Sequence, residues 1–381
     1  MKEVAVRGVD ISTLAEVEAH GGTFFLNHNT VDLFEILKKK NINTVRLKLW
    51  VDPYDEHKKP YLGGTNDLTT MLKLAKRAKD TGMQFMLNLH YSDFWVDPKK
   101  QTKPKQWATL TGKELEQAVY TYTKDVLRAC DECGVIPDYI QIGNEITNGM
   151  LWPDGETPHY LAEERRFASV DSLTKRKQYD SLARLLEAGI SATRESYCKQ
   201  QLKIILHLDF GGADDLYREW FDQMTARAID YDIIGLSYYP YWHEDLHALQ
   251  NNLTQLGERF NKDMIIVETA FGFTSEAPNE GENICTADLA TKTGYSLSIE
   301  GQTTFLQDLL TCVRKAHGSG YQTLGIVYWE PAWLPVKGTS WASLAGMKYA
   351  NDIADTGNHW ANQGLFDFNG NALESLNLFV N

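Results

Sequence analysis

Two glutamates, Glu145 and Glu268, each follow an apolar run, in Tyr-Ile-Gln-Ile-Gly-Asn-Glu and Met-Ile-Ile-Val-Glu. Two carboxyl groups that face each other in a pocket can cleave a glycosidic bond, because one donates a proton to the leaving oxygen while the other attacks the anomeric carbon. A separation of about 5 Å between them gives a covalent intermediate and net retention. The alternative for both glutamates is a structural ion pair with Arg46 or Lys48.

Other polar residues also occupy the C-terminal ends of apolar, β-branched segments. They are Asp10, Arg46, Lys48, His90, Asp93, Asn144, His207, Asp209, Tyr238, Tyr239, Trp329 and Glu330. Such a side chain is costly to bury unless a ligand or a partner satisfies it. If these segments are parallel strands of one barrel, their ends meet in one bowl, where barrels build active sites.

Tryptophans gather near the same segment ends. Six of the ten lie there, namely Trp50, Trp95, Trp152, Trp242, Trp329 and Trp333. Sugars are uncharged and have apolar C–H faces, so indole rings beside a few hydrogen-bonding groups bind them well. Ordinary packing is the alternative for any single tryptophan, but six near one rim favour a carbohydrate site.

The elements that would position these residues alternate between strands and helices. Eight strands are predicted at 5–12, 44–50, 84–92, 139–146, 202–209, 233–240, 264–271 and 324–331. Amphipathic helices are predicted between them, among others at 67–81, 112–133, 175–196 and 301–317. This alternation predicts an α/β fold, a (β/α)₈ barrel, as a single domain over residues 1–381. Long segments follow five of the strands, at 51–65, 94–110, 151–174, 272–299 and 332–365.

Composition limits the partners. The net charge of −13 would repel nucleic acid and anionic lipid, and no window approaches a membrane span. Because the chain starts at Met1 and enters a strand pattern without an apolar leader, we expect a cytoplasmic protein, or a secreted one if a signal peptide precedes this sequence. Five scattered cysteines fit structural thiols, and Cys130 and Cys133 lack a second pair for zinc.

Several segments together resemble glycoside hydrolase family 53, the endo-β-1,4-galactanases. They are Gly-Val-Asp-Ile-Ser, Val-Arg-Leu-Lys-Leu-Trp-Val-Asp-Pro, His-Tyr-Ser-Asp-Phe-Trp-Val-Asp-Pro, Gln-Ile-Gly-Asn-Glu-Ile-Thr-Asn-Gly, Ser-Tyr-Tyr-Pro-Tyr-Trp and the closing Asn-Gln-Gly-Leu-Phe-Asp-Phe-Asn-Gly. The resemblance runs from Gly8 to about Phe379, and the His-Tyr-Ser-Asp and Gly-Asn-Glu-Ile segments are the most specific.

The resemblance implies roles for individual residues. Glu145 would be the acid/base and Glu268 the nucleophile, while Asn144 would hold the 2-hydroxyl of the sugar being cleaved. Further residues would bind or support the substrate: Arg46 and one of Tyr238 and Tyr239 at the nucleophile, His90 and Asp10 at the floor, Trp329 beneath the sugar and Trp95 along the cleft. The run His-Leu-Asp-Phe-Gly-Gly-Ala-Asp departs from the family pattern, so His207 and Asp209 would either bind substrate or act as local scaffold.

This chemistry needs no cofactor. Family members often bind calcium between the last two long loops, and here the 272–299 segment offers Glu276, Glu280, Glu282 and Asp288 without an Asp-x-Asp-Gly run. We therefore expect no catalytic metal and only a weak case for structural calcium.

The resulting prediction is a retaining endo-β-1,4-galactanase that acts on galactan. Three alternatives stay open: an intracellular hydrolase of galacto-oligosaccharides from the same family, a retaining (β/α)₈ enzyme acting on mannan or glucan, and a carbohydrate-binding barrel without catalysis. The tryptophan-rich rim is compatible with a monomer or with an oligomer contact.

Overall fold

The computed structural model describes residues 4–278 and 282–380. Eight parallel strands form a closed barrel in which β15 pairs with β1 as well as with β13. In order round the barrel the strands are β1 (Val6–Asp10), β4 (Thr44–Leu49), β5 (Gln84–Leu89), β6 (Tyr139–Ile142), β11 (Lys203–Leu208), β12 (Ile233–Ser237), β13 (Asp263–Thr269) and β15 (Tyr321–Trp329). Every one overlaps a predicted strand, and the predicted (β/α)₈ fold is confirmed.

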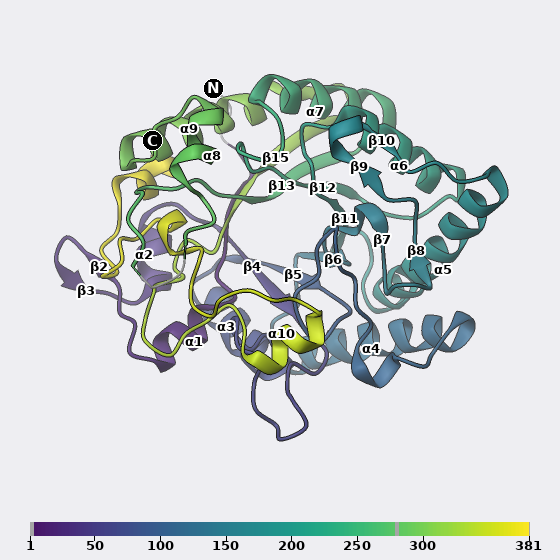
Figure 1. Cartoon of the computed structure of the whole chain (residues 1–381), viewed down its shortest axis with the longest axis horizontal. Coiled ribbons are helices and arrows are strands. Elements are labelled where there is room, and N and C mark those ends of the chain that lie inside the picture. The colour runs from purple at the N-terminus through teal and green to yellow at the C-terminus, as the bar shows by residue number, and fades with distance from the viewer. Residues whose placement is uncertain (1–3, 279–281, 381) are drawn as a thin grey trace.

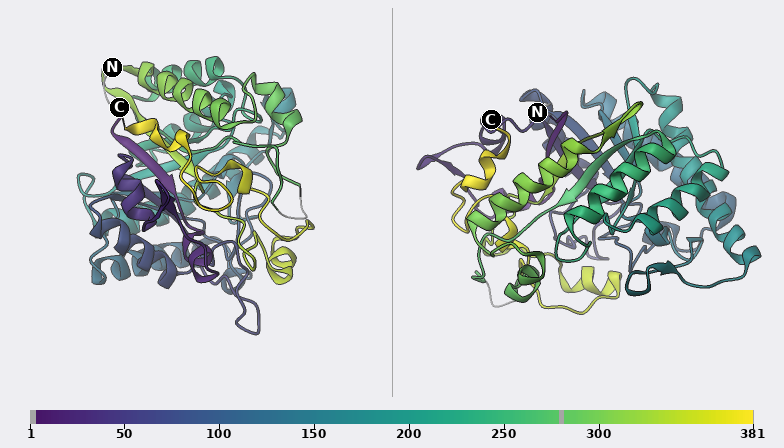
Figure 2. Two further views of the ribbon diagram at one scale, coloured as in Figure 1. Left: turned by 90° about the vertical axis from the view of Figure 1, so that its left-hand side faces the viewer. Right: turned by 90° about the horizontal axis from the view of Figure 1, so that it is seen from above.

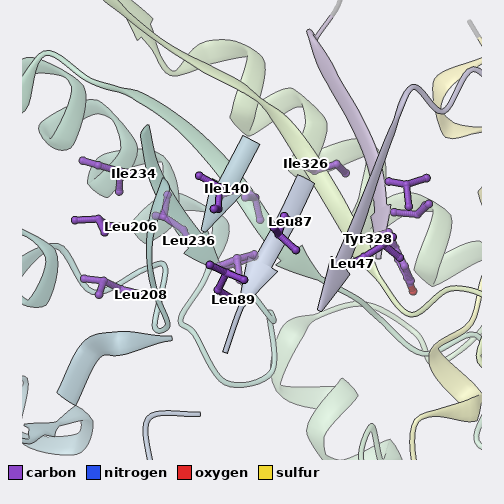
Figure 3. Packing of buried hydrophobic residues seen from close by; sticks show 14 of the residues in the cluster. Leu47, Leu87, Leu89, Ile140, Leu206, Leu208, Ile234, Leu236, Ile326 and Tyr328 are labelled. Atoms are coloured by element: carbon purple, nitrogen blue, oxygen red, sulfur yellow. The ribbon is translucent and has the colours of Figure 1, made fainter. Parts of the chain in front are cut away.

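Helices surround the barrel (Figure 1). They are α2 (Leu33–Lys39), α3 (Leu68–Asp80), α4 (Gly112–Glu132), α5 (Ser172–Ser196), α6 (Asp214–Ala226), α7 (Leu246–Phe260) and α9 (Ile299–Lys315). Alternate side chains of each strand point outward and form the apolar layer beneath these helices. Figure 3 shows part of this layer, from Leu47 on β4 through Leu206 on β11 to Tyr328 on β15.

Local capping sets the helix ends, which differ from the predicted ranges by at most three residues. The Asp67 side chain caps α3 by accepting from the Thr70 N–H, as the start at 67 implies. Helix α5 begins three residues before 175, because Asp171 accepts from the N–H groups of Leu173 and Thr174. Helix α9 ends at Lys315 rather than 317, because β14 (His317–Gly318) forms an antiparallel hairpin with β15.

The interior of the barrel has two layers of different chemistry. The lower layer is an apolar cluster of Val6, Met86, Ile205, Ile233, Ile265, Val267 and Val327. Above it, toward the C-terminal ends of the strands, Arg46 and Lys48 point inward from β4 while Leu47 between them points outward. Because inward positions recur every second residue, one strand can supply both a packed core and a charged floor.

The long segments after the strands contain short elements of their own. They are α1 (Leu14–Ala19), β2 (Phe25–Leu26), β3 (Asn29–Thr30), β7 (Gly149–Met150), β8 (Gly155–Glu156), β9 (Tyr160–Leu161), β10 (Arg166–Phe167), α8 (Ala287–Thr293) and α10 (Leu344–Ala350). Helices α8 and α10 lie along one edge of the molecule in the right-hand view of Figure 2, and the yellow C-terminal segment packs beside α9. Within the described residues, no helix combines the length and the apolar character that a membrane crossing requires.

Candidate active site

A cleft of about 1270 Å³ opens at the C-terminal ends of the barrel strands. Eight of the predicted site residues line it: His90, Trp95, Asn144, Glu145, Asp209, Tyr239, Glu268 and Trp329. The other four, Asp10, Arg46, His207 and Tyr238, are fully buried outside this lining. The cleft therefore brings both glutamates together, and the four buried residues reach a ligand only through their neighbours.

Glu268 on β13 is held by a cation and a phenol. Arg46 NH2 lies 2.8 Å from Oε1 of Glu268, and the Tyr239 hydroxyl donates to Oε2 at 3.1 Å. Tyr238 points elsewhere, since its hydroxyl donates to the backbone oxygen of Glu244 at 2.9 Å. Burial raises the pKa of Glu268, and the positive charges of Arg46 and Lys48 oppose that rise.

Arg46 is the centre of the buried polar layer. Its Nε donates to Gln141 at 2.6 Å, its NH1 to Asp10 at 2.7 Å and its NH2 to Asn144 at 3.0 Å as well as to Glu268. Burial works against its charge, but Glu268 and Asp10 outweigh that effect and the pKa of Arg46 is raised. A guanidinium fixed on four sides holds the nucleophile candidate in one position.

A second buried cation, Lys48, completes the floor. Its Nζ lies 3.0 Å from Asp10 and 2.6 Å from Glu330, and it lies 4.7 Å from the centre of the Trp329 ring. Burial would raise the pKa of Asp10, but Lys48 and Arg46 lower it overall. Burial raises the pKa of Glu330 to about 7, with Lys48 opposing. Lys48 therefore interacts with the Trp329 ring above it and with the carboxylates of Asp10 and Glu330 beside it.

Glu145 has a different environment. It follows β6 with a φ of 46°, in the left-handed region that costs a non-glycine residue about 1 kcal/mol or more. Ser237 Oγ donates to its Oε1 at 2.7 Å, and no cation pairs with it among the residues that the structure describes. Burial, then the charges of Glu268 and Asp209, raise the pKa of Glu145 well above its usual value. These surroundings favour the protonated form of this carboxyl group.

Asn144 is fixed by three neighbours. Its Oδ1 accepts from Arg46 and, at 2.9 Å, from Asn88, while its Nδ2 donates to the backbone oxygen of Val96 at 2.9 Å. An amide nitrogen carries two hydrogens, so one N–H remains for a ligand hydroxyl. Gln101 holds the backbone behind it by donating to the Asn144 oxygen at 2.9 Å.

His90 presents a free donor to the cleft. Its Nδ1 accepts from Trp50 Nε1 at 3.2 Å, which leaves the proton on Nε2. That nitrogen is buried without a hydrogen-bond partner among residues 4–278 and 282–380. Burial, followed by Lys48 and Arg46, lowers the pKa of His90 well below its usual value. A neutral imidazole with an unpaired N–H is suited to a sugar hydroxyl.

The two residues of the divergent segment differ in position. His207 is buried, and both of its ring nitrogens contact protein groups, Glu145 N at 3.3 Å and Ser237 Oγ at 2.8 Å. Asp209 lines the cleft, accepts a hydrogen bond from Thr147, and has a pKa raised well above its usual value by burial. The contacts of His207 favour a scaffold role for this residue, whereas Asp209 can reach a ligand.

Aromatic rings form the walls. Of the six predicted tryptophans, Trp95, Trp242, Trp329 and Trp333 line the cleft, whereas Trp50 and Trp152 do not. Trp50 is buried behind His90, and Trp152 stacks on His159 at 5.0 Å between ring centres. Trp341 and Trp360 also line the cleft, and they could not be predicted because they lie in the long segment after β15, away from any strand end.

Metal ligands are absent from the part of the chain that the structure describes: no group of three or more His, Cys, Asp or Glu side chains is placed to hold an ion. Of the calcium candidates, Glu276, Glu282 and Asp288 are exposed, and Glu280 lies outside the described residues.

Comparison with known proteins gives a consistent assignment. The family model for glycosyl hydrolase family 53 matches residues 6–379. The chain is 31% identical to an endo-beta-1,4-galactanase of Bacillus subtilis, over 100% of this chain and 86% of that protein. It is 33% identical to an arabinogalactan endo-beta-1,4-galactanase of Cellvibrio japonicus, over 94% of this chain and 86% of that protein.

A solved structure agrees. The family 53 catalytic domain of Ignisphaera aggregans superposes with a TM-score of 0.87 at 36% identity, over 100% of this chain and 96% of that one. The chain belongs to glycosyl hydrolase family 53 and is a glycoside hydrolase.

Proposed function

We propose that this member of family 53 is a retaining endo-β-1,4-galactanase, with residues 1–381 acting as one catalytic domain. The observation that carries the mechanism is the contrast between two carboxyl groups in one cleft. Arg46 and Tyr239 bind Glu268, whereas among residues 4–278 and 282–380 the carboxyl group of Glu145 accepts from Ser237 alone and lies near the negative charges of Glu268 and Asp209. The lower pKa belongs to the glutamate with the cation, so Glu268 is the nucleophile and Glu145 the acid.

In the first step Glu268 attacks the anomeric carbon and the bond to the leaving oxygen breaks. Glu145 transfers its proton to that oxygen, so the departing sugar leaves as an alcohol and Glu145 becomes a carboxylate. The second N–H of Asn144 would hold the 2-hydroxyl as positive charge develops on the ring, and the bond from Asn144 Nδ2 to Val96, which leaves that N–H over, supports this role.

In the second step Glu145 removes a proton from water, which attacks the anomeric carbon and releases Glu268. The sugar keeps its β configuration because two inversions occur. Glu145 is then protonated again and Glu268 is ionised, so the cycle closes without any cofactor.

The names of the relatives and the aromatic lining of the cleft support β-1,4-galactan as the substrate. The named relatives in Bacillus subtilis and Cellvibrio japonicus are endo-β-1,4-galactanases. Aromatic side chains flank the glutamates along the cleft, and Trp242 at the rim is 46% exposed, as a stacking surface for a further sugar would be.

Product analysis over time with linear β-1,4-galactan and with galactotetraose tests the proposal. Intermediate oligomers that form early from the polymer support endo cleavage. Activity on the tetraose alone contradicts polymer cleavage and favours the oligosaccharide hydrolase. Inactivity on both, with activity on mannan or glucan, contradicts the galactanase assignment.

A further inference from the structure

A closed ring of hydrogen bonds joins Glu145, His207 and Ser237 behind the cleft. The backbone N–H of Glu145 donates to Nδ1 of His207 at 3.3 Å. Nε2 of His207 lies 2.8 Å from Oγ of Ser237, and that hydroxyl donates to Oε1 of Glu145 at 2.7 Å. His207 and Ser237 are both completely buried, so neither side chain meets the substrate.

One backbone group fixes the direction of two bonds in this ring, and the third bond runs from the Ser237 hydroxyl to Glu145. A peptide N–H can only donate, so Nδ1 of His207 must accept and carries no hydrogen. The neutral imidazole therefore carries its hydrogen on Nε2 and donates it to Ser237 Oγ. The hydrogen of the serine hydroxyl then cannot point back at the ring, and it points at Oε1 of Glu145.

The fixed direction determines which oxygen of Glu145 carries the acidic proton. A hydrogen on Oε1 would face the hydrogen that Ser237 already donates there. The proton must therefore reside on Oε2, and Glu145 is the member of this ring that lines the cleft. If Oε2 is the oxygen that meets the leaving group, the acid needs no rotation before proton transfer.

The neighbouring strands explain how the ring is assembled. His207 on β11 is in register with Gly235 on β12, where a Cβ atom would meet Ile205 at 2.8 Å and His207 Cβ at 3.4 Å. The absence of a side chain at Gly235 therefore lets β12 approach Ile205 on β11 without a clash. A register shift between Leu236 and Ser237 then sets Ser237 opposite Glu268 on β13, and the Ser237 hydroxyl reaches Oε1 of Glu145.

We propose that His207 and Ser237 are positioning residues that keep the acidic proton of Glu145 on Oε2 and hold its backbone in the left-handed conformation. The proposal rests on the assignment of Glu145 as the acid. It requires a neutral His207, because an imidazolium would place a hydrogen on Nδ1 against the Glu145 N–H. Burial, then Arg46, His90 and His243, lower the pKa of His207 well below its usual value, which keeps the ring neutral.

The ring also predicts the sign of a pH effect. The ionisable groups that face Glu145 are Glu268, Asp209, Asp97, Tyr217 and Tyr239. Against these, the Ser237 hydroxyl stabilises the carboxylate and lowers the pKa of Glu145. Since the acid must be protonated, activity falls as pH rises through this pKa, and this fall is the basic limb of the pH profile. Removal of the Ser237 hydroxyl should raise the pKa of Glu145 and therefore shift the basic limb to higher pH.

The first experiment compares kcat/KM against pH for the unmodified enzyme, Ser237→Ala, Ser237→Thr and the control Ser375→Ala. Ser375 is an equally buried serine that donates to Gln302, far along the chain from the glutamates. In Ser237→Ala we expect kcat to fall about 10-fold with KM little changed, and the basic limb to rise by about 0.5–1 pH unit. Ser237→Thr should restore the limb, and Ser375→Ala should leave it in place. An unmoved or lowered limb in Ser237→Ala overturns the proposal.

The second experiment does not depend on activity or on a substitution. Nitrogen NMR of the imidazole in the unmodified protein should show His207 as the neutral Nε2–H form from about pH 5 to about pH 8. The Nδ1–H form, or an imidazolium in this range, overturns the proposal. Failure of the enzyme on β-1,4-galactan would instead contradict the proposed substrate, and the NMR result would still decide on the ring.

Discussion

Glu145, which follows β6, and Glu268 on β13 line the same cleft, but the groups around them differ in charge. Glu268 contacts the Arg46 guanidinium and the Tyr239 hydroxyl, and Lys48 lies nearby. Glu145 contacts one serine hydroxyl and faces Glu268 and Asp209. Burial raises the pKa of both carboxyl groups. Arg46 and Lys48 oppose this rise at Glu268, whereas the charges that act on Glu145 are negative and add to it. The proposed roles of the two glutamates therefore depend on the buried cations beneath the cleft, which lie beside Glu268.

The largest expected effect comes from removing the charge of Glu268. Glu268→Gln keeps the shape but cannot attack the anomeric carbon, so kcat should fall by about 10⁴-fold or more. The loss should be equally large on galactotetraose and on an activated aryl β-galactoside, because both need the nucleophile. Near-complete retention of activity would revive the carbohydrate-binding alternative.

The next largest effect is expected for Glu145→Gln, and it distinguishes the acid from the nucleophile. Glu145→Gln removes the proton donor, so hydrolysis of galactotetraose should fall about 10²- to 10⁴-fold. Formation of the glycosyl-enzyme from an aryl galactoside with a good leaving group should suffer much less, since that leaving group needs little protonation. Rapid-mixing measurements of the first turnover on both substrates check this, and an equal loss on both contradicts the acid role.

A smaller effect is expected at Tyr239, and the chain supplies its own control. Tyr239→Phe removes a hydrogen bond that stabilises ionised Glu268, so the pKa of Glu268 should rise. Since the nucleophile must be ionised, activity is lost as pH falls through that pKa, and the acid limb should move to higher pH. We expect about a 10-fold loss of kcat/KM. Tyr238→Phe is the control, because the Tyr238 hydroxyl donates to the backbone oxygen of Glu244 and not to Glu268; it should leave the acid limb in place. An equal shift of the acid limb in Tyr238→Phe would contradict a specific role of Tyr239.

The smallest effect lies outside both carboxyl environments. Trp242 contacts Tyr239 and Tyr241 by edge-to-face packing and is half exposed at the rim. Trp242→Ala should raise KM for galactan about 2- to 10-fold and leave both limbs of the pH profile in place. Initial rates on polymer across the pH range provide the test. A moved limb would mean that the rim and the carboxyl groups are coupled.

Much of this arrangement could be predicted from the sequence, for identifiable reasons. The strand ends could be located because apolar, β-branched runs stop at polar residues, as in Val-Arg-Leu-Lys-Leu-Trp, and parallel strands bring those ends together. Asp67 could be read as a helix start because it precedes an amphipathic pattern.

The rest depends on contacts that local patterns do not encode. Ser237 is an ordinary strand residue in the sequence, and a register shift between β12 and β13 is what sets it beside the glutamates. Trp50 and Trp95 both follow strand ends, yet one is buried and the other lines the cleft, because the loops after β4 and β5 fold differently. Trp341 and Trp360 lie in a segment without periodicity, whose path is set by packing against the finished barrel.

The proposed mechanism makes Glu268 the nucleophile and Glu145 the acid. Incubation with an activated 2-deoxy-2-fluoro β-galactobioside, which slows release of the covalent intermediate, followed by peptide mass spectrometry, tests it most directly. The predicted result is a single adduct on Glu268, which the Glu268→Gln variant lacks. An adduct on Glu145, or release of the α anomer without any adduct, would contradict the assignment.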